Sequence, residues 1–409
     1  MSSNGELVEK LSARIDRDSE EIQRFFLRML KIKAVNPRMG GPGEAERAEF
    51  LDGFLHEEGF SVERFDVKDA ETGKTRPNLC AKLPGRSPRN IWFVAHMDTV
   101  PEGSMELWKT DPFDPVVKDG KIYARGAEDN GQSLISSLFA LVELKREGVK
   151  PPFNVGVWLV ADEEYGSTYG VTHLLSRHHF RKDDLVVVPD SGSPDGGYIE
   201  IAEKGLLWLK VTTKGKQVHA SLPSRGLNAH RVGNWLATEL DELLHAKYSA
   251  KDRLFDEPGS TFEPTMIEPN VANVNTIPGL DTFYFDCRVL PRYSLDDVVA
   301  DVRVKARAHA DKYGAGIKVE VVNQDSAGPA TSARSEVASM LGKAVQRAIM
   351  KKPKYIGIGG LTVGNLFRKE GIPTAVWSTI DDVAHSPNEY CHIKNLIGDA
   401  KVFASLPLV

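Results

Sequence analysis

The chain has 409 residues, 41% of them hydrophobic and 27% charged, which is typical of a folded protein of two or three domains. Its net charge of −5 excludes a dedicated nucleic-acid-binding protein, which would carry a basic excess. No apolar run approaches the roughly 20 residues that cross a bilayer, and three scattered cysteines do not form a disulfide framework. The N-terminus shows no apolar secretion signal, so we expect a cytoplasmic protein that binds neither nucleic acid nor membrane.

The first half of the chain alternates between helical and strand patterns. Apolar spacing predicts helices at 19–32 and 44–58, and short β-branched runs predict strands at 62–67, 79–83 and 91–95. A hairpin around an Asp-Gly pair at 119–120 is followed by a helix at 132–146, a strand at 154–160, a helix at 169–176 and a strand at 185–188. Apolar strands alternating with amphipathic helices predict an α/β domain with a mixed sheet covered on both faces.

A second pattern begins at residue 205. A strand at 206–213, a helix at 228–246, strands at 270–275 and 282–290, a helix at 295–313 and a strand at 317–322 give the order β-α-β-β-α-β, with an irregular insertion at 249–268. The α/β pattern then resumes with elements at 335–350, 355–358, 363–369, 374–377 and 394–404. We therefore predict a catalytic domain of residues 1–204 and 324–409, interrupted by a ferredoxin-like domain of residues 205–323.

Acidic and imidazole side chains stand next to the predicted elements of the α/β domain. They are His96 and Asp98 after strand 91–95, Asp129 before helix 132–146, Glu163 and Glu164 after strand 154–160, Asp190 after strand 185–188, and His385 near the C-terminus. Because the carboxyl ends of strands in an open α/β sheet form the edge where ligands bind, we expect these side chains to meet there.

Each position also has a purely structural interpretation. His96 could be held by a carboxylate for structure alone, Asp129 could be a helix N-cap, and residues 162–164 could form a solvated acidic turn. Clustered acids repel one another unless cations neutralise them, and carboxylates with imidazoles suit zinc or a related divalent ion. Two histidines and three acids exceed one tetrahedral site that keeps a water, so they favour two ions that share a carboxylate.

Five motifs in this order resemble those of the M20 family of di-zinc amidohydrolases and peptidases, which includes succinyl-diaminopimelate desuccinylase, acetylornithine deacetylase, aminoacylase and glutamate carboxypeptidase. The similarity extends from about residue 20 to the C-terminus. The motifs are His96-Met97-Asp98-Thr99-Val100-Pro101, Arg125-Gly126-Ala127-Glu128-Asp129, Asp162-Glu163-Glu164-Tyr165-Gly166-Ser167, Pro189-Asp190 and His385-Ser386-Pro387-Asn388-Glu389.

The resemblance implies a centre of two divalent metal ions, with zinc as the first choice and cobalt or manganese as alternatives. It places one ion on His96, Asp129 and Asp190. It places the second ion on Asp129, Glu164 and His385, so that Asp129 bridges the two.

The resemblance also implies roles for two acids that do not bind metal. Glu163 would be the general base that activates a metal-bridging water. Asp98 would hold the ring of His96, as carboxylates behind metal-binding histidines do. Residues 130–132 are Asn-Gly-Gln instead of the family's usual residues, but none of these positions is a ligand.

The inserted domain would be the lid and dimerisation domain of this family. His219 resembles the lid histidine that stabilises the oxyanion, often across a dimer. Asn275 and Arg288 lie in segments that resemble those binding the substrate carboxylate, although each polar residue could instead have a local structural role. The loop 359–362 follows the family's specificity loop only loosely.

These features predict a hydrolase that cleaves the amide bond of an N-acyl amino acid, of the desuccinylase or deacetylase type. A carboxypeptidase or dipeptidase of the same family is the alternative within the enzyme class. A non-catalytic homologue is a further alternative, but it would have no need for Glu163 beside an intact set of ligands. The expected partners are a small-molecule or short-peptide substrate with a free carboxylate and a second copy of the chain.

Overall fold

The computed structural model describes residues 3–409 and divides the chain into two compact units. The first unit comprises the chain up to Ile201 together with Ala330–Tyr355 and Thr362–Val409. The second comprises Ala202–Pro329 and Ile356–Leu361, so it interrupts the first unit in sequence. It also takes up the short segment Ile356–Leu361, which the sequence-based division assigns to the catalytic domain.

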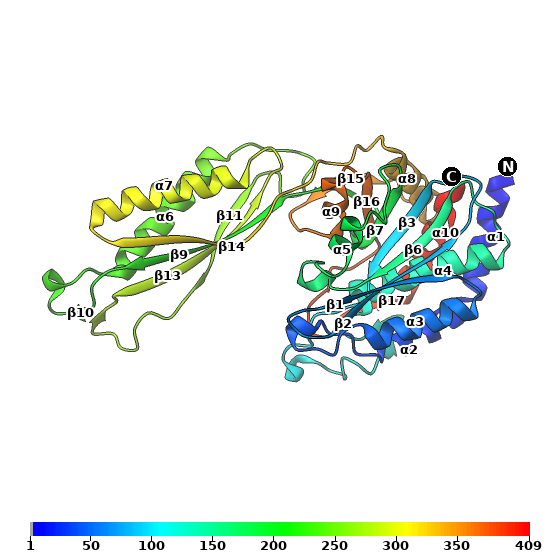
Figure 1. Ribbon diagram of the computed structural model, residues 1–409, viewed down its shortest axis with the longest axis horizontal. Helices are drawn as coiled ribbons and strands as arrows, with labels where there is room; N and C mark the ends of the chain where they lie inside the picture. Colours follow the sequence, from blue (N-terminus) through cyan, green and yellow to red (C-terminus); the bar gives the residue numbers. More distant parts are fainter. Residues whose placement is uncertain (1–2) are drawn as a thin grey trace. The chain divides into compact units, whose positions relative to one another are not determined.

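The first unit is built on an eight-stranded mixed sheet with the strand order β1-β2-β6-β3-β7-β16-β8-β15 (Figure 1). Strand β3 runs parallel to β6 and β7, whereas β2 runs antiparallel to β1 and β6. The strands are β1 Val62–Lys68, β2 Thr75–Leu83, β3 Asn90–His96, β6 Asn154–Val160, β7 Leu185–Gly192, β8 Tyr198–Glu203, β15 Lys354–Ile358 and β16 Thr374–Ser378. A separate small sheet contains β4 Val116–Lys118, β5 Lys121–Tyr123 and β17 Tyr390–His392.

Helices cover both faces of the large sheet. The helices are α1 Ser3–Arg17, α2 Ser19–Leu30, α3 Ala45–Glu57, α4 Ser133–Arg146, α5 Val171–Ser176, α8 Glu336–Ile349, α9 Val363–Lys369 and α10 Ile393–Ser405. Helices α5 and α9 bury Val171 and Phe367 in a cluster with Trp92 and Val94 of β3. Helix α4 packs against β3 and β6 on the opposite face, and α10 packs on α4.

This two-sided cover explains the central strands. Every residue of β3 is buried, and its alternating faces carry Ile91 and Phe93 on one side and Trp92 and Val94 on the other. A strand that is covered on both faces has a continuous run of apolar residues, and β3 and β6 show such runs in the sequence. Both strands therefore end abruptly at polar residues on one edge of the sheet.

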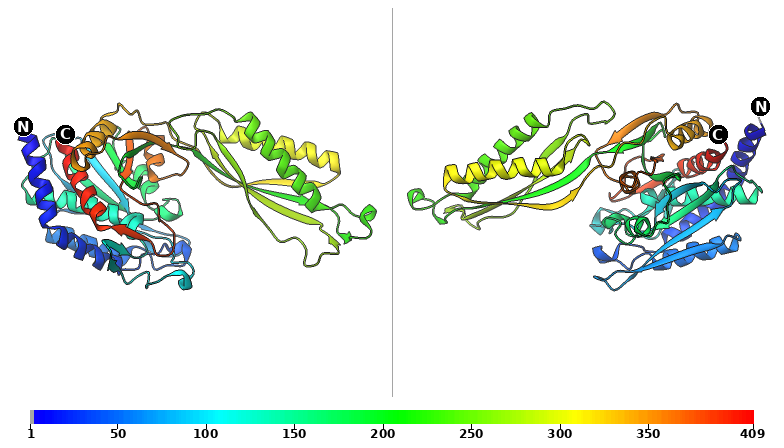
Figure 2. Two further views of the ribbon diagram at one scale, coloured as in Figure 1. Left: turned by 180° about the vertical axis from the view of Figure 1, so that it is seen from behind. Right: turned by 45° about the horizontal axis from the view of Figure 1, so that its top comes forward.

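The second unit has a four-stranded antiparallel sheet in the order β11-β13-β9-β14. Its elements are β9 Gly205–Lys214, β10 Val218–His219, α6 Ala229–Lys247, β11 Thr261–Ile267, β12 Thr276–Ile277, β13 Leu280–Val289, α7 Leu295–Tyr313 and β14 Gly316–Asp325. Both helices lie on the same face of the sheet (Figure 2). Residues of β9 alternate, with Leu207, Leu209 and Val211 buried against the helices while Trp208 is exposed.

The predicted fold class is confirmed: a mixed-sheet α/β unit is interrupted by a β-α-β-β-α-β unit. Two details are wrong. Residues 270–275 form no strand. Instead the second long strand of this unit in chain order is β11, at the opposite edge of the sheet from β14, and it lies inside the segment expected to be irregular. Pro264 explains the error, because proline is confined to edge strands and bulges, and β11 is an edge strand whose register shifts between Pro264 and Met266.

Candidate metal centre

The candidate site lies in the first unit, at the carboxyl ends of its central parallel strands. His96 is the last residue of β3, and it is paired with Val160, the last residue of β6. The acidic turn with Glu163 and Glu164 follows β6 directly, and Asp190 lies toward the end of the neighbouring β7. Parallel strands in register bring these positions to one edge of the sheet, as the sequence analysis expects.

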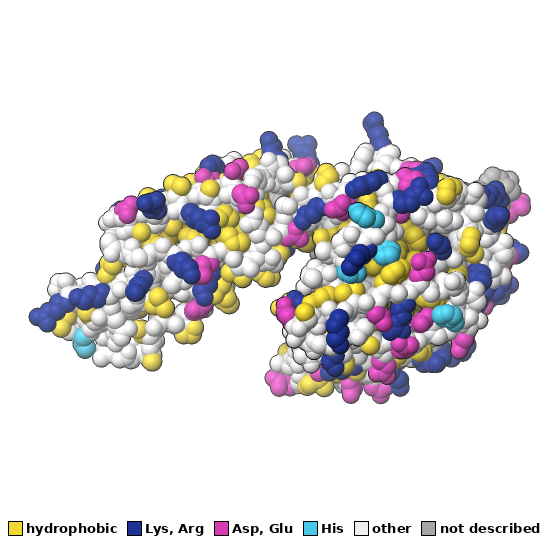
Figure 3. Space-filling view, in the orientation of Figure 1, with side chains coloured by type: hydrophobic (Ala, Val, Ile, Leu, Met, Phe, Trp, Pro, Cys, Tyr) yellow, Lys and Arg dark blue, Asp and Glu magenta, His cyan; other side chains and the backbone are white. Residues whose placement is uncertain are grey.

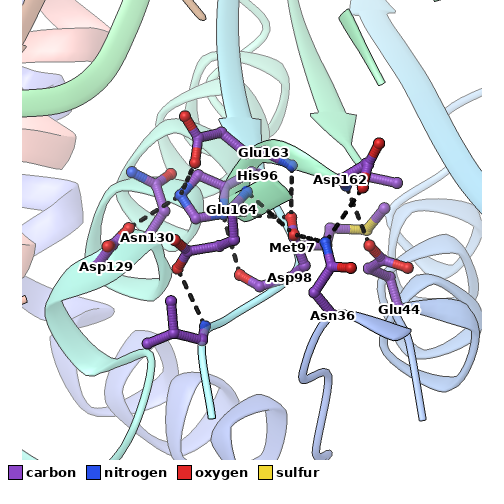
Figure 4. A network of polar contacts seen from close by, with 12 residues as sticks. Asn36, Glu44, His96, Met97, Asp98, Asp129, Asn130, Asp162, Glu163 and Glu164 are labelled. Carbon is purple, nitrogen blue, oxygen red and sulfur yellow. Dashed lines mark hydrogen bonds and ion pairs between the residues drawn. The ribbon is translucent and has the colours of Figure 1, made fainter. Parts of the chain in front are cut away.

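One group of side chains surrounds the ring of His96 (Figure 4). Its Nε2 lies 2.9 Å from Oδ1 of Asp129 and 3.9 Å from Oε2 of Glu163, both labelled in Figure 4. It also lies 3.5 Å from Oδ1 of Asp190. Asn130 donates a hydrogen bond from Nδ2 to the same oxygen of Asp190 at 2.7 Å. The structure therefore brings together the three residues predicted to hold the first ion, with the predicted base beside them.

A second group forms around His385. Its Nε2 lies 3.1 Å from Oδ2 of Asp129 and 3.1 Å from Oε2 of Glu164. The two carboxylate oxygens of Asp129 thus face different histidines, which is the arrangement that a shared carboxylate requires. The His385 side chain is 57% exposed whereas that of His96 is 2% exposed, so solvent and small molecules reach the centre from the His385 side.

The electrostatics of the cluster fit divalent cations. Burial raises the pKa of Glu163 well above its usual range, and the charge of Asp190 adds to the effect. Burial and the charge of Asp129 raise the pKa of Glu164 to about 7, while hydrogen bonds to Asp129 and Glu164 raise the pKa of His385 to about 10. Four carboxylates this close repel one another, and cations bound among them would relieve that repulsion.

Ligand atoms are also spaced for metal binding. In residues 3–409, two triplets place one ligand atom each within 4.8 Å of one another: His96 with Glu163 and Asp190, and His96 with Asp129 and Glu164. Imidazole nitrogens and carboxylate oxygens are the donors that zinc and related divalent ions take. The residues therefore fit a divalent-metal centre, although the first triplet includes Glu163, which the sequence analysis assigns to proton transfer.

Asp98 contacts the acidic turn more directly than the sequence analysis expects. Its Oδ1 accepts a hydrogen bond from the main-chain N of Glu163 at 3.0 Å, and its Oδ2 accepts one from the main-chain N of Glu164 at 3.2 Å. Nδ1 of His96 lies 3.0 Å from the main-chain oxygen of Asp98 and 3.6 Å from its carboxylate. Asp98 therefore fixes the turn after β6 as well as the ring of His96.

Glu389 is a residue of the site to which the sequence analysis gives no role. It is buried, and its carboxylate accepts hydrogen bonds from the main-chain N of Glu128 at 2.9 Å and of Asp129 at 3.0 Å. Arg125 donates to the same carboxylate at 2.6 Å. Both Arg125 and Glu389 belong to the motifs that carry the family resemblance. The motifs therefore mark both residues, but they do not indicate that the two side chains contact each other.

The three predicted substrate-binding residues all lie in the second unit. His219 is in β10 and is paired with Thr276, next to Asn275, whose main-chain oxygen accepts a hydrogen bond from Ala220 at 2.8 Å. Arg288 lies in β13 opposite Leu206, the second residue of β9, whereas β10 follows the last residue of β9. At about 3.3 Å per residue, the length of β9 separates Arg288 from His219 by roughly 25 Å.

Comparison with known proteins identifies the family. Residues 92–408 match the model of peptidase family M20/M25/M40, and the chain belongs to this family. An uncharacterised metallohydrolase of Methanocaldococcus jannaschii is 38% identical over 401 residues, covering 94% of this chain and 98% of the relative. A succinyl-diaminopimelate desuccinylase of Rickettsia bellii is 26% identical over 377 residues, covering 91% and 92%. The protein is thus a hydrolytic enzyme, an M20 metallohydrolase of the peptidase or amidohydrolase type.

Solved structures share the fold. The aminopeptidase PepT of Bacillus cereus superposes with a TM-score of 0.75 at 21% identity, covering 95% of this chain and 98% of that one. A dinuclear metal-binding M20 peptidase of Bacillus subtilis gives a TM-score of 0.68 at 15% identity, covering 96% and 98%. None of the helices in residues 3–409 has the length and apolar character needed to cross a bilayer.

Proposed function

We propose that the enzyme hydrolyses the amide bond of an N-acyl amino acid, as a desuccinylase or deacetylase does. The single observation that carries the proposal is the position of Glu163, whose carboxylate lies 3.9 Å from His96 at the edge of a cluster of ligands. A carboxylate at this position supports a role in proton transfer. The similarity to succinyl-diaminopimelate desuccinylases supports this substrate class over a peptide.

The centre is proposed to hold two divalent ions, with zinc as the first choice and cobalt or manganese as alternatives. His96, Asp129 and Asp190 would bind one ion, and Asp129, Glu164 and His385 the other. When bound, such ions polarise an amide carbonyl and lower the pKa of water toward 7. The two-sided contacts of Asp129 support the shared position.

Glu163 would act as the proton carrier. It would accept a proton from the attacking water and return that proton to the nitrogen of the leaving amine. The carboxylate accepts the proton and the resulting carboxylic acid donates it, so one side chain serves both steps. Asp98 supports this role, because its hydrogen bond to the main-chain N of Glu163 fixes where the side chain begins.

Recognition of the substrate is proposed to need two copies of the chain. His219 would donate a hydrogen bond to the developing oxyanion, and Arg288 would bind the substrate's free carboxylate. Since roughly 25 Å separates these residues within one unit, one small substrate cannot contact both from the same subunit. A homodimer through the second unit, with His219 supplied to the partner's site, would satisfy both contacts.

The charge of the second unit supports an anionic substrate. The stretch from Leu206 to Thr238 contains five Lys or Arg residues and no acid, in a chain whose net charge is −5. Lys and Arg side chains gather at the end of the unit where β10 lies (Figure 3). Within the described residues, Lys214, Lys216, Arg225 and Arg231 are exposed at this end, so a carboxylate-bearing substrate would be attracted to the region of His219.

The decisive assay compares substrate classes on one preparation loaded with zinc. N-succinyl-diaminopimelate, N-acetylornithine and a set of dipeptides are offered in parallel to the wild type, Glu163→Ala and Glu163→Gln. We expect hydrolysis of the N-acyl amino acids, and a loss of at least about 1,000-fold in kcat for both variants with metal content unchanged. Faster turnover of dipeptides would replace the proposal with the peptidase alternative, and near wild-type turnover by Glu163→Ala would remove Glu163 from the mechanism.

A further inference from the structure

Asp162, the residue before the proposed base, has an unusual backbone. Its φ is +67°, in the left-handed region, and it stands between the end of β6 and the short helical turn Glu163–Tyr165. Residues other than glycine enter this region at a cost, and they persist there only when their surroundings hold them. The side chain of Asp162 is fully buried, so the reason must lie in its contacts.

Four groups hold this residue from separate parts of the first unit, and Figure 4 shows two of them, Asn36 and Glu44, beside Asp162. Oδ1 of Asp162 lies 3.1 Å from Nη1 of Arg76 and accepts a hydrogen bond from Nδ2 of Asn36 at 3.2 Å. Its Oδ2 accepts one from the main-chain N of Tyr169 at 3.0 Å. Its own main-chain N donates to Oε1 of Glu44 at 3.1 Å. Both the carboxylate and the amide of Asp162 are therefore fixed.

The holding groups are themselves locked together. Arg76 and Glu44 form a fully buried ion pair, in which Nε of Arg76 donates to Glu44 at 2.9 Å. Asn36 donates from the same Nδ2 to Asp98 at 2.7 Å, so it joins Asp98 to Asp162. A buried charge that loses its partner is strongly unfavourable, which makes each of these positions sensitive to its neighbours.

This network meets the main chain of the turn at three consecutive residues. Glu44 accepts from the N of Asp162, and Asp98 accepts from the N of Glu163 and of Glu164. Asn36, Glu44 and Arg76 all precede residue 92, where the match to the family begins. The segment ahead of that match thus supports the main chain from which Glu163 extends.

We propose that Asp162 is a positioning residue for Glu163, held in the left-handed conformation by Arg76 and Asn36 so that the base faces His96. The inference rests on the proposed role of Glu163, but it concerns the chain's own geometry. A shift of about 1 Å in a reacting group can cost about 100-fold in rate, so loss of this support should lower kcat without removing a substrate contact.

Three substitutions at one position separate the parts of this role. Asp162→Gly removes the side-chain contacts, but glycine adopts the left-handed conformation without strain. Asp162→Ala removes the same contacts and also disfavours that conformation. Asp162→Asn keeps one acceptor oxygen and is a residue type that enters the left-handed region. We expect kcat to fall by about 10-fold for the Asn variant, about 100-fold for Gly and more for Ala, with KM changed by less than about threefold. Metal content should remain that of the wild type.

A measurement without substrate tests the same point. Hydrogen–deuterium exchange in the metal-free protein should show the amides of Glu163, Glu164 and Tyr169 exchanging at least about 10-fold faster in Asp162→Gly than in the wild type. The matched control is Asp184→Asn, since Asp184 is a buried aspartate of the same unit whose carboxylate accepts hydrogen bonds from Asn90 at 2.7 Å and Trp92 at 2.9 Å and not from the groups that hold Asp162. It should leave exchange at the turn unchanged.

The outcomes separate this inference from the proposed function. If Asp162→Gly keeps wild-type exchange at the turn, or Asp184→Asn speeds it equally, the positioning role is wrong whatever the enzyme hydrolyses. If exchange speeds up as expected but kcat stays within about twofold of the wild type, the network supports the fold and not the base. If the wild type hydrolyses none of the offered amides, the proposed function fails, and the exchange result still decides whether Asp162 holds the turn.

Discussion

The carboxylate of Glu389 accepts a hydrogen bond from the main-chain N of Asp129 at 3.0 Å, so the proposed bridging ligand is held by a residue 260 positions later in the chain. All four donors to this carboxylate are N–H groups, from Arg125, Gly126, Glu128 and Asp129. An acceptor with two oxygens therefore suits this place, and an amide would turn an NH₂ group toward a donor. Residues behind metal ligands affect metal affinity by about 10- to 100-fold.

We accordingly expect Glu389→Gln to weaken metal binding by about 10- to 100-fold, measured by competition with a chromophoric chelator. Glu336→Gln is the matched control, because Glu336 pairs with Arg89 on the exposed surface and is not part of the centre. Unchanged affinity in Glu389→Gln would show that its hydrogen bonds do not support the ligands.

Removal of the metal gives the second prediction. Treatment with a chelator should abolish hydrolysis, and addition of zinc or cobalt should restore it, because water without a bound ion keeps a pKa near 15.7. Asp129→Ala should bind at most about one equivalent of metal by elemental analysis, since the contacts to His96 and His385 both depend on this carboxylate. Two equivalents in the variant would contradict the shared position.

The sequence predicts the edge of the sheet well because local signals coincide there. Buried parallel strands such as β3 and β6 appear as apolar runs, and polar residues directly after them, such as His96 and Glu163, must lie at the carboxyl edge. The pairing of the residues around Asp129 then follows from the topology of the fold. By contrast, Pro264 argues against a strand at β11, because proline lacks the main-chain N–H that a central strand needs. Only an edge strand tolerates this loss, and the sequence does not show that β11 lies at the edge of its sheet.

The polar network behind the site could not be predicted. Glu44 and Arg76 are charged residues in amphipathic segments, where exposure is the ordinary expectation, yet both are fully buried. Their burial depends on partners brought together by the fold, such as Glu44 and Asp162, which are 118 positions apart. The separation of His219 from Arg288 likewise follows from the strand register of β9 and β13, which no local pattern fixes.

Exchange of subunits tests where His219 acts. When His219→Ala and Glu163→Ala subunits are mixed and allowed to reassociate, a mixed form of the proposed homodimer would have one site with an intact Glu163 and an intact partner histidine. Half of the dimers are mixed and each has one such site, so activity should recover to about one quarter of the wild type. If His219 acts in its own subunit, every site lacks one group and no recovery is expected.

The contacts of Arg288 predict a preference for substrates with a free carboxylate. Its Nε and Nη2 contact Asp286 at 2.7 and 3.0 Å, while its Nη1 donates only to the main-chain oxygen of Gly359 at 3.3 Å within the described residues. If that nitrogen binds the substrate carboxylate, Arg288→Ala should raise KM for carboxylate substrates by about 10-fold or more, and change KM little for their amidated analogues. Equal losses on both would leave only the ion pair with Asp286.

Asp399, a buried residue of α10, makes the stability of the protein depend on pH. Its Oδ2 accepts hydrogen bonds from the main-chain N of Thr379 at 3.0 Å and from Gln132 at 2.9 Å, but burial dominates and raises the pKa of Asp399 to about 7. In the unfolded chain an aspartate has a pKa of about 3.9. Between these values the folded state binds a proton that the unfolded state has released, so the free energy of unfolding falls as pH rises through this window.

Asp399→Asn isolates this effect, because its amide oxygen can accept both hydrogen bonds and its side chain does not titrate. At about 1.4 kcal/mol for each unit of pKa difference, the wild type should lose up to about 4 kcal/mol relative to the variant between pH 4 and pH 7, with little further change above pH 8. Urea unfolding at pH 5 and pH 8 measures the difference, with Asp183→Asn on the exposed surface as the control. Parallel pH profiles for the wild type and Asp399→Asn would show that Asp399 is ionised in the folded protein across this range.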